Sequence, residues 1–203
     1  MNKKAKEFIK YVKAECKKYG IKCDLRRTKY VRLPGKIRCS GYFDDHDKEL
    51  VCSMNRPDSI EILAHEFAHL TQWLDNIDLW KKADISIPKV DEWLMGEDVP
   101  DIKKHLAVSR DLELDNEKRT VKIIKKFGLD VDIDMYIKKA NCYIHFYNRM
   151  LATRKWYNAD NNPYANKRLV KEMPAHFRMN YNKIPKKIEK VFIEEQIWLW
   201  KNQ

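Results

Sequence analysis

The sequence predicts a mainly helical α+β domain with a small sheet in its N-terminal part. Glycine is scarce, at five residues in 203, and Lys, Glu, Ile and Leu are abundant, which favours helices over a β-sandwich. Segments with β-leaning chemistry are confined to residues 21–54, and helical periodicity dominates from residue 58 onward. We expect one domain over residues 1–203, with the sheet in 1–75 and a helical part in 76–203.

The N-terminal part is expected to begin with a helix. Residues 3–19 have an amphipathic pattern that Gly20 ends. Residues 21–33 carry β-leaning side chains, and Pro34-Gly35 then predicts a turn.

Two further strands are expected at residues 37–44 and 49–54, joined as a hairpin by the polar turn 45–48. Together with the segment before them, they predict a small three-stranded antiparallel sheet that follows the first helix.

The rest of the chain predicts helices with one irregular interval. A buried helix is expected at 58–74, and residues 76–104 are expected to hold only a short helix or two. Longer helices are expected at 106–127 and 134–157, and a last one at 185–201.

The formal net charge is +11 and the isoelectric point is about 9.3. A positive charge of this size can attract nucleic acid or acidic proteins. Lysines that are spread over every helix are also typical of an ordinary solvated surface. The odd count of five cysteines, without a CxxC pair, indicates reduced thiols. No signal peptide or membrane helix is recognisable, so we expect a cytoplasmic protein, in the host cytoplasm if phage-encoded, without a membrane partner.

Residues 65–69 read His-Glu-x-x-His within the predicted helix 58–74. Residues four apart share one helix face, so His65 and His69 can present two nitrogens to one zinc ion. Glu66 points about 100° away around the helix, beside the ion, where it can act as a base for an attacking water. The alternative is a pair of structural histidines held by hydrogen bonds.

The third ligand is expected on the helix 106–127. Helical phase places Glu113 and Glu117 in the middle of its apolar face. Two inward glutamates need a positive partner, and zinc with its histidines fits that need. Either glutamate can be the ligand while the other supports an imidazole, and salt bridges to buried Arg or Lys are the alternative for both. Manganese, iron or nickel also suit such a site.

The His-Glu-x-x-His motif, followed by Glu113-x-x-x-Glu117 on a later helix, resembles the gluzincin group of zinc metallopeptidases. The resemblance implies a zincin-like domain with Glu113 as the third ligand and Glu117, in place of the commoner Asp, as support for a histidine. The order of elements is also similar to compact bacterial and phage metallopeptidase domains of the ImmA/IrrE type. The Ala-Asn pattern usual after the glutamate in that family is absent, which indicates a phage-encoded branch.

The expected function is therefore a zinc-dependent metallopeptidase, in which Glu66 activates the zinc-bound water for attack on a peptide bond of a protein or peptide substrate. His176, Tyr157 and Tyr164 are candidate donors for the oxyanion. The alternative is a basic module that binds nucleic acid or protein on a zincin scaffold. This includes a protease similar to the SprT type, which acts on DNA-bound proteins. An intact Glu66 favours the enzyme, because a scaffold needs only the histidines.

Overall fold

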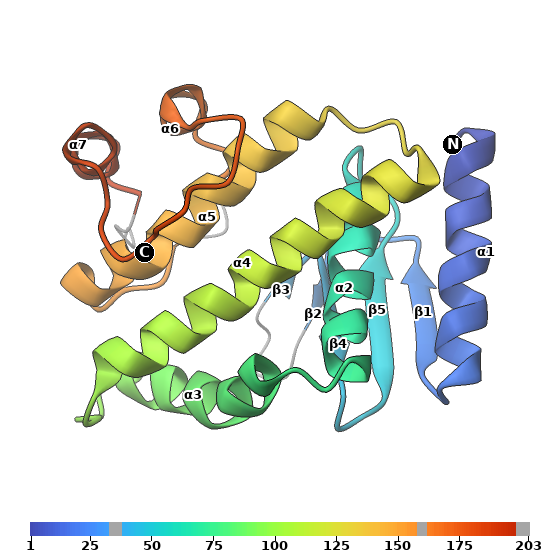
Figure 1. Cartoon of the computed structure of the whole chain (residues 1–203), viewed down its shortest axis with the longest axis horizontal. Coiled ribbons are helices and arrows are strands. Elements are labelled where there is room, and N and C mark those ends of the chain that lie inside the picture. The colour runs from blue at the N-terminus through green and yellow to red at the C-terminus, as the bar shows by residue number, and fades with distance from the viewer. Residues whose placement is uncertain (33–37, 158–161, 198–203) are drawn as a thin grey trace. The chain divides into compact units, whose positions relative to one another are not determined.

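Figure 1 shows the computed structural model, which describes residues 1–32, 38–157 and 162–197. Its elements, in chain order, are α1 (Lys3–Lys18), β1 (Lys22–Arg26), β2 (Val31–Arg32), β3 (Arg38–Cys39), β4 (Gly41–Asp44), β5 (Glu49–Ser53), α2 (Ser59–Leu74), α3 (Asp78–Leu94), α4 (Ile102–Phe127), α5 (Ile133–Thr153), α6 (Lys167–Glu172) and α7 (Lys186–Glu194). The structure is thus a mainly helical α+β fold, as the sequence predicts.

The chain forms two compact units. Residues 1–77 and 116–131 make up the first unit, and residues 78–115 and 132–203 make up the second. Helix α4 passes from the second unit into the first without interruption. The expectation of a single domain over the whole chain stays a prediction.

The three-stranded sheet is mixed, so the expectation of an antiparallel sheet was wrong. The strand order is β1-β5-β4; β4 pairs antiparallel with β5, whereas β1 pairs parallel with it. The hairpin of β4 and β5 matches the prediction. A tight turn forces neighbouring strands to be antiparallel, but the long connection from β1 to β5, which includes β2 to β4, lets these two strands run in the same direction.

Strand β5 occupies the centre of the sheet because its residues suit burial on both faces. Leu50, Val51 and Cys52 are fully buried, and such continuous apolar runs are typical of strands covered on both sides. Helix α2 packs on β4 and β5, and α1 packs beside β1 (Figure 1). The ring of Phe8 on α1 contacts the rings of Phe67 on α2 and Phe127 on α4, which completes the core of the first unit.

The second unit has its own core, in which α5 is central. The core includes the buried side chains of Trp93, Phe146, Met150, Leu169 and Phe192, which come from α3, α5, α6 and α7. Helix α5 ends at Thr153, before the expected end at 157, because Arg154 takes up a left-handed conformation with a φ of 51° that stops the helix.

Helix α3 corrects the expectation of only short helical pieces between residues 76 and 104. It runs for 17 residues and has Pro88 in its interior. A proline there removes one amide donor and costs about 3 kcal/mol. The helix persists because one face, formed by Ala83, Ser86, Val90 and Trp93, is buried. Packing of this face therefore outweighs the local preference against a helix.

The last helix is shorter than the expected 185–201, since α7 ends at Glu194 and residues 195–197 form a turn. The expectations for residues 198–201 and for the turn at Pro34-Gly35 lie outside the described residues. Within residues 1–32, 38–157 and 162–197, no helix combines the length and the hydropathy that a bilayer crossing requires.

A buried histidine on α5 makes the second unit sensitive to acid. His145 is fully buried, and neither ring nitrogen has a hydrogen-bond partner among the described residues. Its ring lies against that of Tyr181, with centroids 5.0 Å apart. Burial, followed by the charges of Arg178 and Arg110, lowers the pKa of His145 to about 4 from 6.5. The imidazole is therefore neutral in the folded protein at neutral pH.

This lowered pKa predicts a loss of stability between pH 6.5 and 4. In that window the unfolded chain takes up a proton at His145 and the folded chain does not, so the free energy of unfolding falls as the pH falls. The full difference is about 3 kcal/mol. Urea unfolding at several pH values should show this slope in the wild type and a shallower one in His145→Phe. Equal slopes in the two proteins would contradict the assignment.

Candidate metal centre

Helix α2 places the His-Glu-x-x-His motif at the edge of the first unit's core. Its side chains at Leu63, Ala64, Ala68 and Leu70 are fully buried. The two motif histidines are only half-buried, and their ring centroids lie 4.9 Å apart with the planes at 85°. The four-residue spacing thus brings both imidazoles to one side of the helix, as its geometry requires.

Three side chains form a cluster with the donor set of a metal site. His65, His69 and Glu113 each offer one ligand atom, and these atoms all lie within 4.8 Å of one another. Ligands bound to zinc at about 2.0–2.2 Å in a tetrahedral set are separated by about 3.3 Å. Small rotations of the three side chains close that difference, so the residues fit a zinc ion.

The first unit orients the imidazole of His65 through α4. Nδ1 of His65 lies 3.4 Å from Oε1 of Glu117 and 3.0 Å from the side-chain amide of Asn116. Oδ1 of Asn116 is buried and has no partner among the described residues. If the Asn116 amide is rotated so that Oδ1 and Nδ2 exchange places, Oδ1 accepts a hydrogen bond from Nδ1–H of His65. In that tautomer, Nε2 carries the lone pair that a metal requires.

His69 is held in the same manner from within α2. Its Nδ1 lies 2.9 Å from Oε1 of Gln72, which accepts a hydrogen bond and leaves the lone pair on Nε2. Burial, with the charge of His65 adding to it, lowers the pKa of His69 to about 3. The ring is therefore neutral at physiological pH, which is the form that binds metal.

Glu113 reaches the histidines because α4 is one continuous helix. It lies four residues, one turn, before Glu117, whose position beside His65 is described above. Arg119, two residues further along α4, reinforces this alignment by donating to Oδ2 of Asp75 at 2.5 Å and to Oγ1 of Thr71 at 3.3 Å. The cluster includes Glu113 and not Glu117.

Glu66 is enclosed between α2 and the edge strand β4. It is 7% exposed, and burial raises its pKa to about 7, with Glu117 raising it further and His65 lowering it. A Cβ atom at Gly41 of β4 would lie 2.9 Å from Cγ of Glu66 and 2.9 Å from the carbonyl oxygen of Val51. Gly41 therefore leaves the space that the Glu66 side chain occupies.

Substitution of Gly41 tests this close approach. We expect Gly41→Ala to lower the free energy of unfolding by about 1–3 kcal/mol, because the carbonyl of Val51 belongs to the sheet and cannot move away. Urea unfolding measures the loss. In a Glu66→Ala background the same substitution should cost less, since one of its two contacts is gone. Equal costs in both backgrounds would show that Glu66 does not lie against β4.

Three tyrosines of the second unit are subject to the charge of Glu113. The hydroxyls of Tyr143 and Tyr147 lie 3.2 Å apart. Burial first, and then the charge of Glu113, raises the pKa of both hydroxyls well above 10. Burial and Tyr164 raise the pKa of Tyr157, with a smaller contribution from Glu113. These hydroxyls are protonated donors within electrostatic reach of Glu113.

His176 occupies a different place in the second unit. It lines a hollow of about 540 Å³ with Pro174 and Arg178, and its carbonyl oxygen accepts a hydrogen bond from Asn141. It is not part of the cluster found among the described residues.

No family model, curated protein or solved structure matches this chain. The sequence pointed to His65, His69 and Glu113, and the structure brings these three together. It did not point to Asn116 or Gln72. The spacing of Gln72, three residues after His69 and seven after His65, was a signal for the same helix face.

Proposed function

We propose that this protein is a zinc-dependent metallopeptidase of the gluzincin type, similar to ImmA/IrrE-like domains. The observation that carries the proposal is the convergence of two imidazoles and one carboxylate, with ligand atoms within 4.8 Å of one another, next to a buried glutamate. His65, His69 and Glu113 would hold the ion. When bound, zinc supplies a Lewis acid that polarises water and a substrate carbonyl.

Side chains of the protein would carry out the proton transfers and hold the ligands in place. Glu66 takes the proton of the attacking water and delivers it to the leaving amine, a transfer that suits a carboxylate whose pKa lies near neutrality. Glu117 and Asn116 keep the ring of His65 in place, and Gln72 does so for His69.

The sheet edge supplies a place for an extended substrate. Strand β4 is an edge strand of the described three-stranded sheet, and Gly41 on it adjoins Glu66. A peptide that pairs with β4 as an added strand would run past the proposed base, with main-chain hydrogen bonds that do not depend on sequence.

Chelator-sensitive proteolysis tests the proposal. The purified protein should cleave an unstructured probe such as fluorescently labelled casein, lose that activity with a chelator, and recover it when zinc is restored. Cleavage that persists in the chelator, or no cleavage of casein and of a mixed peptide library with zinc present, would contradict the proposal.

A further inference from the structure

Five lysines form one row along α1. They follow one another at intervals of three or four residues, and all are exposed: Lys3, Lys6, Lys10, Lys13 and Lys17. At about 100° per residue, the five fall within about 80° of arc around the helix. Glu7 and Glu15, the acidic residues of α1, lie outside this arc. The lysine row is therefore a continuous line of positive charge about 21 Å long.

The packing of α1 holds the lysine row towards solvent. The buried residues Ala5, Phe8, Val12 and Cys16 centre on a direction about 135° from the row. Phe8 and Tyr11 pack against Phe127 at the end of α4, with ring centroids 4.9 and 4.8 Å apart. This contact anchors the helix through a side that carries none of the five lysines.

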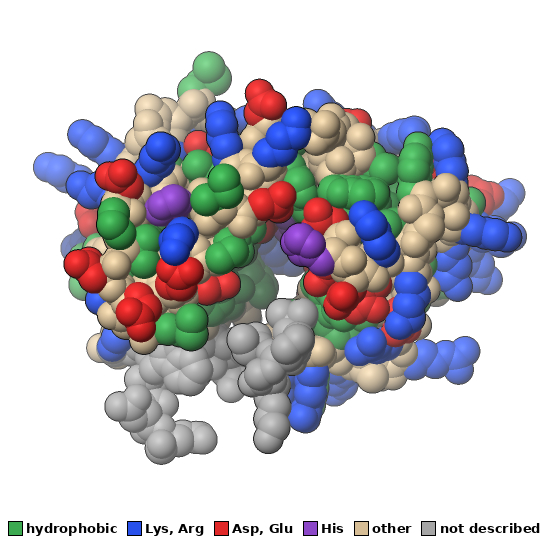
Figure 2. All heavy atoms as spheres, turned by 90° about the horizontal axis from the view of Figure 1, so that it is seen from below, with side chains coloured by type: hydrophobic (Ala, Val, Ile, Leu, Met, Phe, Trp, Pro, Cys, Tyr) green, Lys and Arg blue, Asp and Glu red, His purple; other side chains and the backbone are tan. Residues whose placement is uncertain are grey.

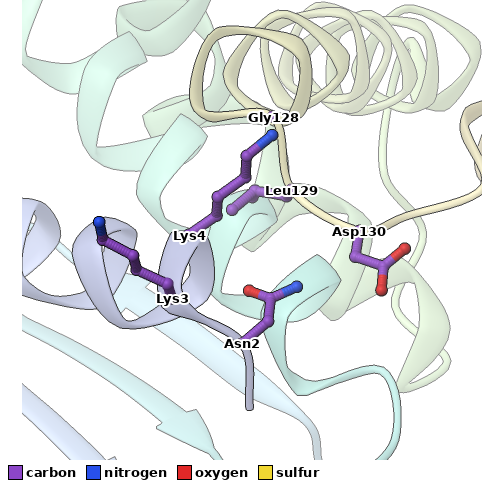
Figure 3. Close-up of a pocket in the computed structure, with 6 residues that line it drawn as sticks. All are labelled: Asn2, Lys3, Lys4, Gly128, Leu129 and Asp130. Carbon is purple, nitrogen blue, oxygen red and sulfur yellow. The ribbon is translucent and has the colours of Figure 1, made fainter.

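Two neighbouring lysines of α1 extend in different directions (Figure 3). In Figure 3, Lys4 extends toward Gly128, whereas Lys3, the first member of the row, extends away from Gly128; both residues line a hollow of about 480 Å³. Figure 2 shows Lys and Arg side chains projecting from the right-hand edge, the side on which α1 lies in Figure 1. The first described ion pair of the row, Lys3 with Glu7 at 4.0 Å, is exposed and therefore weak.

The chemistry of the lysine row selects a partner class. Insertion into a membrane interface would need an exposed apolar face on α1, and that face is buried in the core. Single-stranded nucleic acid is held by aromatic side chains that stack on bases, and protein interfaces are anchored by aromatic or arginine side chains. The row has neither. A regular line of point charges matches the phosphate backbone of a duplex, whose charges repeat along a strand about every 3.4 Å of axis.

We propose that the lysine row of α1 binds the phosphate backbone of double-stranded nucleic acid without sequence preference. This function is independent of the metal centre, because α1 contributes no residue to the cluster of His65, His69 and Glu113. It would hold the protein on nucleic acid whether or not the peptidase proposal is correct.

Fluorescence anisotropy with a short labelled DNA duplex tests the proposal on the full-length protein. The test variant replaces the five lysines of the row by glutamine. The matched control also replaces five exposed lysines by glutamine, but in the second unit: Lys167, Lys171, Lys183, Lys186 and Lys190. It therefore removes five positive charges, as the row variant does. A third variant replaces the five row lysines by arginine, which preserves the charge.

At about 50 mM salt we expect the wild type to bind and the row variant to lose at least about tenfold in affinity. The slope of log affinity against log salt should become shallower by up to about 0.9 for each lysine that contacts phosphate. The control and the arginine variant should stay within about threefold of the wild type, since an unaltered row keeps its phosphate contacts.

The proposal would be overturned if the wild type did not bind duplex, or if the row variant and its matched control lost the same affinity for duplex. It would also be overturned if the wild type bound vesicles of phosphatidylcholine and phosphatidylserine but not duplex. Circular dichroism of each variant shows whether a loss of affinity comes from unfolding. Retained binding in the arginine variant would show that substitution of all five positions leaves the fold intact.

Discussion

Glu66→Gln should lower the turnover of the proposed peptidase by about 10²–10⁴-fold while zinc stays bound. The amide keeps the shape of the side chain in the space beside Gly41, but it cannot accept a proton from the attacking water. Initial rates on labelled casein and the zinc content of the same preparation measure the two effects.

Glu61→Gln is the matched control for this substitution. Glu61 lies in the first turn of the same helix and outside the metal cluster, so its loss of charge should leave turnover within about threefold, since the proposed ligands and Glu66 stay in place. Unchanged turnover in Glu66→Gln would contradict the role of Glu66 as the base that takes the proton of the attacking water.

Removal of zinc should destabilise the protein strongly. An ion that binds only the folded state contributes about 4 kcal/mol when its free concentration is 1,000 times its dissociation constant. For a chain of this size, that corresponds to a fall in Tm of roughly 8–16 °C. The effect should be large here because an ion held by His65, His69 and Glu113 would join α2 to α4.

Thermal unfolding with zinc and with a chelator measures this contribution. His69→Ala is the comparison, since it removes one ligand and should show little difference between the two conditions. Equal Tm values for the wild type with and without zinc would contradict a metal site at this position.

Much of the candidate site was readable from the sequence because it depends on helical periodicity. The four-residue spacing of His65 and His69 and the inward phase of Glu113 are local properties of helices, and the structure retains both helices. Asn116 was not predicted, since its contact with His65 joins segments 51 residues apart. Such a pairing depends on tertiary packing that local pattern does not encode.

The strand directions in the sheet and the length of α3 could not be predicted from local sequence pattern. The β-leaning segment that contains β1 was recognised, but nothing in it specifies a parallel partner. Its alignment with β5, in which Lys22 pairs with Glu49, follows from the path of the connection between them. Pro88 and its neighbours indicated a break, whereas burial of one face of α3 overrides that preference.

The metal content of the purified protein tests the central claim most directly. Elemental analysis should be made on the wild type and on His65→Ala, Glu113→Ala and Glu117→Gln. We predict about one zinc per chain in the wild type and none in His65→Ala or Glu113→Ala. Glu117→Gln should keep the ion with an affinity about 10–100-fold lower, since it supports a ligand. A wild-type protein that holds no metal after zinc is supplied would contradict the account.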